Sequence, residues 1–413
     1  MKLPMDLAIW IAALVPILFL LIAIMKFGWN ASKAAPIGML LAFFIAVFFY
    51  KASPLALAWE TGKGVWNAAT ILLVIWPAVY LYELIGETKA FGAIRCGIQS
   101  ITKHELLQIL IFGWVFPSFL QGITGFGVAV AVGAPLLLSI GVTPFYSIVI
   151  VLLCHSWGAT FGTLALAWNA LVQQAGLDGG QQFCAAILAA AMLWAFNLIS
   201  VTYSCWLYGK GKAIREIFPV ILVLSLIMGG GQVILAPLNA QISFFIPSAA
   251  ALMAIFLISR TKKYSRIWKI ENTQIIAERK EKIKKEALMS FNEAFLPYYV
   301  LTIITIFCLL IQPVNKLLSV WKFGFAFPET ITGYGYVTTA EQLFSPLAPL
   351  TYAGSFLLVS SVISVFYYIN KSYISKDRLT IVWKNTFTKC ISPTIAITSL
   401  IVMAKFMGSS GQI

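Results

Sequence analysis

A glycine-rich segment near residue 120 carries the residue types that could hold a small anion. It reads QGITGFGVAVAVG and lies between two apolar runs. Glycine has no Cβ, so a ligand can reach backbone N–H groups there, and a helix that begins nearby adds partial positive charge. The alternative is that these glycines only let helices pack closely. The predicted substrate-binding residues in this segment are Gln121, Gly122, Thr124, Gly125, Phe126 and Gly127.

The following apolar segment, residues 144–174, offers hydroxyl groups at an interruption. About thirty residues exceed the length of one straight span, and the run is broken between residues 156 and 163. Broken backbone inside lipid is tolerated only where protein or a water-filled cavity receives its freed N–H and C=O groups. Two breaks in succession are typical of a transporter site. We therefore add Ser156, Thr160 and Thr163 to the predicted substrate-binding residues.

Two ionisable residues could couple such a site to protons. His155, one of two histidines, stands at the break, where it could carry a proton or bond a carboxylate. A neutral, hydrogen-bonded core histidine is the other interpretation. Glu83 lies near one end of a predicted span, where a carboxylate that reaches the membrane interface is the plainer alternative to a proton relay. Both residues are candidates for proton coupling.

The composition places these residues in a membrane protein. The chain has 413 residues, of which 60% are hydrophobic and only 11% charged, against about 25% charged residues in soluble domains. Its net charge of +14 lies between apolar runs, where it reports topology, so we expect no nucleic-acid binding. None of the common zinc, phosphate-loop or dinucleotide motifs is present in the sequence, and we expect neither a cofactor nor a metal site.

The elements that must position the site are membrane-spanning helices. A span needs about 20 apolar residues, and continuous apolar character indicates helices rather than the alternating strands of a barrel. Residues 54–67 are predicted to form a separate interfacial helix, with Trp59 and Trp66 at the lipid headgroups. The predicted full spans are 7–25, 36–50, 68–85, 183–206, 217–234, 242–258, 295–311, 345–368 and 391–407.

Residues 106–142 are predicted to form a re-entrant hairpin. Its first arm is expected to stop at Pro117 after about twelve apolar residues, or roughly 18 Å of helix, which is too short to cross a bilayer. With the broken span 144–174, the prediction is an all-α polytopic membrane protein of about eleven transmembrane segments, with a re-entrant hairpin and a discontinuous helix.

The basic residues predict the orientation of the chain. Residues 260–286 contain ten basic and four acidic side chains, so this loop is placed in the cytoplasm. A patch for anionic lipids is the alternative interpretation of these charges. Counting spans back from the loop places the N-terminus outside, in a multi-pass plasma-membrane protein, and makes the hairpin enter from the cytoplasm.

The segment FLQGITGFGVAVAVGAPLLLSIGVTP resembles the lactate permease family of organic-acid transporters. That resemblance implies uptake of short 2-hydroxymonocarboxylates, such as lactate and glycolate, with protons. It also implies two inverted repeats, each with a hairpin and a discontinuous helix. Gln121 stands where family members often have Glu, which puts in question both proton coupling and lactate itself as the substrate.

The repeat pattern divides the chain into four parts. Residues 1–206 are predicted to form the complete first repeat, 207–259 the connecting spans, 260–294 the basic cytoplasmic loop, and 295–413 an incomplete second repeat. By this division the sequence ends where a second hairpin is expected. The expectation is that the 413-residue form carries half of a binding site and does not transport alone.

The predicted function is secondary transport of a short 2-hydroxymonocarboxylate, with a proton as the coupling ion. The alternatives are another small organic or sulfonated anion, export, or coupling to sodium. A passive channel would differ because it cannot accumulate substrate. An intramembrane enzyme would need paired carboxylates, a zinc motif or a nucleophile with its base inside the spans. The expected partners are the substrate, its coupling ion and membrane lipids, with no expectation about oligomeric state.

Overall fold

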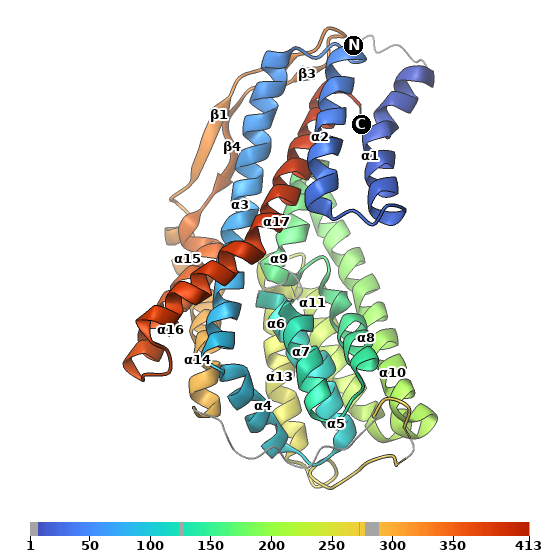
Figure 1. Ribbon diagram of the computed structural model, residues 1–413, viewed down its shortest axis with the longest axis vertical. Coiled ribbons are helices and arrows are strands. Elements are labelled where there is room, and N and C mark those ends of the chain that lie inside the picture. The colour runs from blue at the N-terminus through green and yellow to red at the C-terminus, as the bar shows by residue number, and fades with distance from the viewer. Residues whose placement is uncertain (1–6, 124–127, 272, 277–288, 413) are drawn as a thin grey trace. The chain divides into compact units, whose positions relative to one another are not determined.

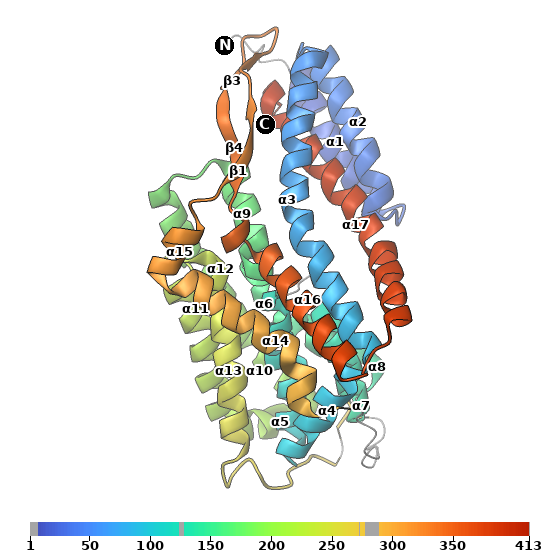
Figure 2. The same cartoon turned by 90° about the vertical axis from the view of Figure 1, so that its left-hand side faces the viewer.

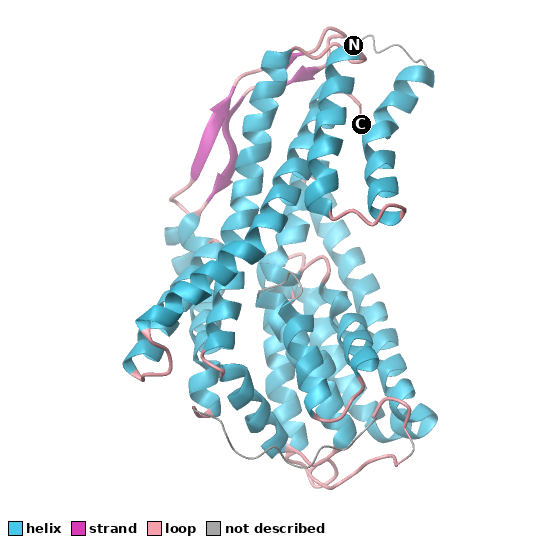
Figure 3. Ribbon diagram, in the orientation of Figure 1, coloured by secondary structure: helices cyan, strands magenta, loops and turns pink. Residues whose placement is uncertain are grey.

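The computed structural model describes residues 7–123, 128–271, 273–276 and 289–412. The chain forms two compact units, which are described separately. Within the described residues, nine helices are long and apolar enough to cross a membrane, or ten if a bent pair is counted as one span. One of these, Gly179–Leu235, is 57 residues long and breaks at Gly209–Lys210, where the dihedral angles are not helical. Counting its two legs separately gives the predicted number of eleven, and the helical class is confirmed (Figure 3).

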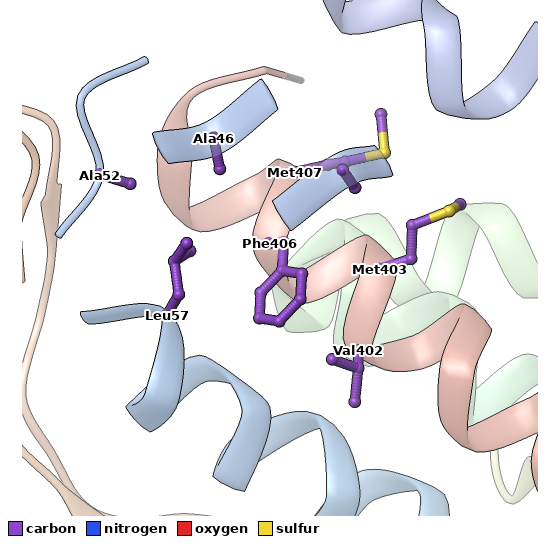
Figure 4. Packing of buried hydrophobic residues seen from close by; sticks show 8 residues of the cluster. Ala46, Ala52, Leu57, Val402, Met403, Phe406 and Met407 are labelled. Atoms are coloured by element: carbon purple, nitrogen blue, oxygen red, sulfur yellow. The ribbon is translucent and has the colours of Figure 1, made fainter. Parts of the chain in front are cut away.

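Unit 1 comprises Met1–Trp76, Ile311–Ser355 and Trp383–Ile413. Its helices have apolar faces because nearly every turn carries aliphatic or aromatic side chains. They are α1 (Leu7–Met25), α2 (Ala31–Phe48), the first half of α3 (Pro54–Glu87), α15 (Gln312–Leu318) and most of α17 (Lys376–Ser410). Between α2, α3 and α17 a buried apolar core forms (Figure 4), made of Ala42, Ala46, Ala52, Leu57, Val402, Met403, Phe406 and Met407.

The prediction of a separate interfacial helix at 54–67 is wrong. Those residues are the start of α3, which continues without a break to Glu87. Trp66 is occupied by protein rather than by headgroups: its indole N–H donates to the Ser345 carbonyl at 3.1 Å, and its ring packs edge-on against Phe325. The protein thus provides the polar and apolar contacts of Trp66 that the prediction had assigned to lipid headgroups.

Those two partners belong to a strand hairpin that the helical prediction missed. Strands β1 (Phe323–Phe327) and β4 (Glu341–Leu347) pair antiparallel, and β2 (Thr330–Ile331) pairs with β3 (Val337–Thr338) beyond them (Figure 2). A short 3₁₀ turn, Pro349–Thr351, leads to α16 (Ala353–Asn370). This span therefore begins eight residues later than the predicted 345, because 345–347 belong to β4.

Unit 2 comprises Pro77–Leu310 and Phe356–Val382. After the second half of α3 come the elements of the hairpin, the broken span and the long α10. Their bounds are α4 (Ala90–Ile101), α5 (Glu105–Leu110), α6 (Phe116–Ile123), α7 (Val128–Ser139), α8 (Pro144–His155), α9 (Gly162–Ala175), α10 (Gly179–Ser225), α11 (Gly231–Leu235), α12 (Ala240–Ser243), α13 (Phe245–Ser259) and α14 (Phe291–Thr305).

Three π-helical turns interrupt these helices, at Ile111–Val115, Leu226–Gly230 and Ile306–Leu310. The second overlaps the glycine triplet 229–231. The first explains why Pro117 does not stop the hairpin arm, as the sequence had suggested. Phe116 already bonds five residues back to the Ile111 carbonyl, so the widened turn accommodates a residue without an N–H group. The arm continues to Ile123, and Glu105–Ile123 is long enough to span.

Candidate functional site

The hairpin and the broken helix meet inside unit 2. Arms α6 and α7 lie side by side (Figure 1), and α6 also contacts α8, α9 and α13. Helix α8 ends at His155, a 3₁₀ turn covers Ser156–Gly158, and α9 starts at Gly162 with its direction changed by 54°. The predicted interruption of this span is confirmed.

The break contains unusual backbone. Thr163, Leu164 and Ala165 all have positive φ, at 52°, 52° and 61°. Left-handed backbone costs an L-residue with a Cβ about 1–2 kcal/mol, and it persists only where the surrounding structure enforces it. Such strain is concentrated at ligand sites and switch regions of proteins. From three consecutive residues of this kind we infer that the start of α9 has a role besides crossing the membrane.

Aromatic side chains hold the hairpin arm against the break. The Trp157 indole N–H donates to Ser118 Oγ at 3.1 Å, which ties the 3₁₀ turn to α6. The Trp157 ring lies 4.2 Å from the Phe244 ring, centroid to centroid. Phe244 in turn fills the space between two glycines. A Cβ on Gly158 would lie 2.4 Å from its Cζ, and one on Gly122 would lie 3.2 Å from its Cδ1.

The same junction brings Gln121 to the first turn of α9. A Cβ on Gly162 would lie 3.2 Å from both Cγ and Nε2 of Gln121. The Gln121 Oε1 atom is buried and accepts no hydrogen bond within the described part of the chain. A buried amide oxygen without a partner costs about 1–3 kcal/mol, so it needs an explanation. Its position beside the broken helix makes a bound polar ligand the natural partner.

Two further polar side chains share this property. Both amide atoms of Gln232 and the Ser248 Oγ are buried without a hydrogen-bond partner among the described residues. Their backbones are close, because Gly231 packs on Pro247: a Cβ on Gly231 would lie 2.9 Å from Pro247 Cγ. Helix α11, which carries Gln232, also contacts α12, and α12 contacts α9. Unpartnered neutral polar atoms thus lie on α6, α11 and α13, and α6 and α13 each contact α9.

The sequence-predicted substrate-binding residues divide into two groups. Gln121, Gly122 and the Ser156–Thr163 break are brought together, although the Ser156 hydroxyl is occupied by the Leu153 carbonyl at 2.7 Å. The carbonyl of Thr160 accepts from the Trp168 amide at 3.0 Å, and the Thr163 side chain is buried. Thr124, Gly125, Phe126 and Gly127 lie outside the described residues.

The two proton-coupling candidates are both placed in unit 2. The His155 ring Nδ1 bonds to the Val151 carbonyl one turn back, so Nδ1 carries a proton. Glu83 is buried on α3, at 8% exposure, rather than extended into an interface as the plainer interpretation had it. The hydrogen bond of His155 agrees with the core interpretation, and it does not remove this residue from a proton path.

Sequence reasoning missed Ser118, Trp157, Phe244, Gln232 and Ser248. For the polar members a signal was available, because Gln232 and Ser248 interrupt otherwise apolar runs. Phe244 and Trp157 gave none, since aromatic residues are common throughout this chain. Their role follows only from the meeting of segments about ninety residues apart.

The sequence of the chain is similar to that of a known protein family and of several known proteins. Residues 10–413 match the model of a family described as L-lactate permease. The chain is 28% identical to an L-lactate permease of Halalkalibacterium halodurans over 298 residues, 70% of this chain and 55% of that protein. It is 30% identical to an L-lactate permease of Escherichia coli K12, over 52% of this chain and 39% of that protein. The glycolate permease GlcA of Escherichia coli K12 matches at 30% identity, over 52% of this chain and 38% of its own length.

The matched stretches span about half or less of the length of these curated relatives. No solved structure matches the chain significantly. The match to the family covers nearly the whole sequence, including the hairpin, the broken helix and both units. The chain therefore belongs to the L-lactate permease family.

Proposed function

We propose that this protein transports a short 2-hydroxymonocarboxylate of the lactate or glycolate type across the plasma membrane. The observation that supports this most directly is that Gln121, beside the broken helix, has a buried amide oxygen without a partner among the described residues. Gln232 and Ser248, on α11 and α13 of the same unit, also have buried, unpartnered polar atoms. The family match and the printed names of the relatives, L-lactate permease and glycolate permease, supply the substrate class.

Neutral groups suit a substrate with one carboxylate and one hydroxyl. Amide N–H groups and a serine hydroxyl can donate to the carboxylate, and an amide oxygen can accept from the substrate hydroxyl. In a low-dielectric site such bonds are strong, and they avoid burying a permanent charge that would hold the anion too tightly for release.

The binding set in this proposal keeps the predicted residues and adds two. Gln121, Gly122, Ser156, Thr160 and Thr163 provide or shape the site at the hairpin and the break. Gln232 and Ser248 are the additions. Thr124, Gly125, Phe126 and Gly127 stay predicted contributors from the hairpin tip.

We propose the proton as the coupling ion, with His155 and Glu83 as the candidates to carry it. A second candidate function is transport of another small organic or sulfonated anion, exported or coupled to sodium. Gln121 favours that second candidate, because an amide cannot take up a proton as the Glu found in many relatives could.

The test is equilibrium binding and proteoliposome uptake with labelled L-lactate, glycolate, acetate and a short alkyl sulfonate. Binding is measured beside uptake because binding does not require the chain to complete a transport cycle alone. We expect saturable binding of a 2-hydroxy acid at least about tenfold tighter than acetate, a difference of about 1.4 kcal/mol. Saturable binding of the sulfonate without binding of either hydroxy acid would move the assignment to the second candidate.

The coupling ion is tested in the same vesicles. An inside-alkaline gradient should drive accumulation, and an inward sodium gradient at constant pH should not. His155→Gln should then change the pH dependence of uptake or binding more than the amount of folded protein. An unchanged pH profile removes His155 from the mechanism and leaves Glu83.

The orientation and repeat division also belong to the proposal. We place the N-terminus outside, the 260–286 loop in the cytoplasm, and the inverted repeats at 1–206 and 295–413. Single cysteines at Asp178 and Lys262, in a background without other cysteines, should react with an impermeant reagent from opposite sides. Labelling of both positions on intact cells contradicts this orientation.

A further inference from the structure

A shallow groove of about 570 Å³ lies on the surface of unit 2, along α10. It is apolar in character, with three of its side chains strongly exposed: Ile199 at 65%, Tyr203 at 47% and Trp206 at 44%. It runs to the turn where α10 reverses, since Trp206 precedes that turn and Ile214 follows it. The groove is lined by Leu198, Ile199, Thr202, Tyr203, Trp206 and Ile214.

The aromatic pair in the groove marks a membrane interface. The Tyr203 and Trp206 rings are stacked, 5.8 Å apart with 15° between their planes. Tyrosine and tryptophan are enriched at the level of lipid headgroups, because each combines an apolar ring with one polar group. The groove therefore has an apolar part deeper along α10 and an interfacial part beside the turn.

The turn at that end of the groove is basic. Lys210, Lys212 and Arg215 are all exposed, and none of the three forms an ion pair with another described residue. The neighbouring carboxylate of Glu216 does not neutralise them, because its partners are Lys263 and Arg266 from the following loop. Three positive charges without an ion-pair partner in the described part of the chain thus stand next to an apolar groove that opens at the interface.

We propose that this groove binds an anionic diacyl phospholipid. An acyl chain lies along the apolar lining, and the phosphate contacts Lys210, Lys212 and Arg215. Charge complementarity selects this occupant over a neutral lipid, since each basic residue near a membrane surface contributes about 1 kcal/mol toward binding anionic lipid. The turn is basic, so it is also expected on the cytoplasmic side, where anionic lipid is abundant.

The proposal is tested by quenching Trp206 fluorescence in lipid nanodiscs. The full chain is reconstituted in phosphatidylcholine that contains either brominated phosphatidylglycerol or brominated phosphatidylcholine at the same mole fraction. The signal of Trp206 is the difference between the wild type and Trp206→Phe, because the other tryptophans are common to both. We expect stronger quenching of this signal by the anionic brominated lipid.

The matched variants separate a built site from general surface charge. The triple variant Lys210→Gln, Lys212→Gln and Arg215→Gln should lose the preference for the anionic lipid. Each substitution should lower the affinity for that lipid roughly fivefold. The triple variant Lys371→Gln, Lys376→Gln and Lys384→Gln removes the same charge from other exposed positions and should leave the preference unchanged. Equal quenching by both lipids, or an equal effect of both triple variants, overturns the proposal. A Trp206 signal that neither lipid quenches means that protein, such as a second copy, covers the groove, and it also overturns the proposal.

Discussion

Two sets of buried polar groups, one in each unit, differ in how they are satisfied. In unit 1, Glu60 and Lys63 on α3 are 3% and 2% exposed, and their charges lie 2.9 Å apart. The Lys63 ammonium also lies over the rings of Phe327 and Phe344, at 5.7 and 5.6 Å. In unit 2, the buried Gln121 Oε1, Gln232 amide atoms and Ser248 Oγ are neutral and lack partners among the described residues.

We call Glu60 and Lys63 the closed cluster, because their charges pair with each other. We call Gln121, Gln232 and Ser248 the open cluster, because they have polar atoms without partners among the described residues. The charges of Glu60 and Lys63 compensate each other, although Glu60 Oε1 accepts no well-directed hydrogen bond. A buried ion pair of this kind supplies its own counter-charge, and removing one member is costly. The amides of Gln121 and Gln232 are incomplete without a ligand. We infer that the first cluster stabilises its unit and that the second is reserved for substrate.

The largest expected effect comes from blocking the open cluster. Gly158→Ala would place a methyl group about 2.4 Å from the Phe244 ring, which must then move away from Gly122. Misplacement of a site by about 1 Å can cost a factor of 10², so we expect substrate affinity to fall about 100-fold. Equilibrium binding of labelled lactate measures this. Gly92→Ala is the control, because nothing lies within 4 Å of a Cβ there, and equal affinity of the two variants would refute the role of Gly158.

The next largest effect is expected in the closed cluster. Lys63→Met leaves the Glu60 carboxylate buried and unpaired, which should lower the free energy of unfolding by about 3–5 kcal/mol. Glu60→Leu combined with Lys63→Met should recover most of that loss, since both charges are gone. Thermal unfolding in detergent gives the ranking.

An exposed ion pair provides the control for this prediction. Arg378 pairs with Glu87 and is 58% exposed, so Arg378→Met should change stability by no more than about 1 kcal/mol. If Lys63→Met proves as mild as Arg378→Met, the closed cluster contributes no more than a surface pair and the comparison fails.

A smaller effect should distinguish open from closed groups within unit 2. Gln232→Leu removes two unpartnered polar atoms, so the stability without ligand should stay equal or rise by about 1 kcal/mol. Asn197→Leu should instead destabilise by about 1–3 kcal/mol, because Asn197 Oδ1 accepts from the Trp114 indole at 2.8 Å. Unfolding curves of the two variants, measured side by side without ligand, test this. A loss of stability for Gln232→Leu as large as that for Asn197→Leu would mean that Gln232 has a structural partner.

The smallest effect concerns a titrating group outside the spans. His104 is fully buried, its ring is stacked on Trp268, and Glu216 lies 3.7 Å away with Lys263 and Arg266 beyond it. Burial lowers the pKa of His104, more than Glu216 raises it, and Arg266 lowers it further. The folded state therefore resists protonation, and stability is lost as the pH falls through the unfolded pKa near 6.5.

His104→Asn isolates this contribution, because asparagine retains a helix cap for Leu107 but does not titrate. The wild type should lose stability between pH 7 and 5.5 relative to the variant, by about 1.4 kcal/mol for each unit by which the pKa is lowered. A difference between the two proteins that stays constant with pH would show that His104 does not titrate in this range.

Much of the fold was predictable because apolar length is a local property. The spans and the broken helix at 156–163 follow from residues close in sequence. The hairpin of β1 and β4 was not predictable in this way, because it depends on α3: Trp66 reaches Phe325 and Ser345 across more than 250 residues. The residues predicted to form a separate interfacial helix are the first turns of α3, and Trp66 in those turns makes this contact.

The site was predictable only in part, for the same reason. Gln121 and Gly122 stood out by their glycine-rich surroundings, and Thr163 by its place at the break. Gln232 and Ser248 interrupt apolar runs, but the structure was needed to show that their side chains are buried without partners among the described residues and that α13 contacts the hairpin arm. Spacing along the chain carries no information about such a junction.

The most direct test of this account is lactate binding to two variants that alter one cluster each. Labelled L-lactate is titrated onto wild type, Gln232→Leu and the double variant Glu60→Leu with Lys63→Met, with the folded fraction of each measured in the same sample. The account predicts at least tenfold weaker binding for Gln232→Leu and, for the double variant, an affinity within about twofold of wild type, since tenfold is about 1.4 kcal/mol. Unchanged affinity in Gln232→Leu together with lost affinity in the double variant would contradict it, because the substrate would then depend on the charged cluster of unit 1.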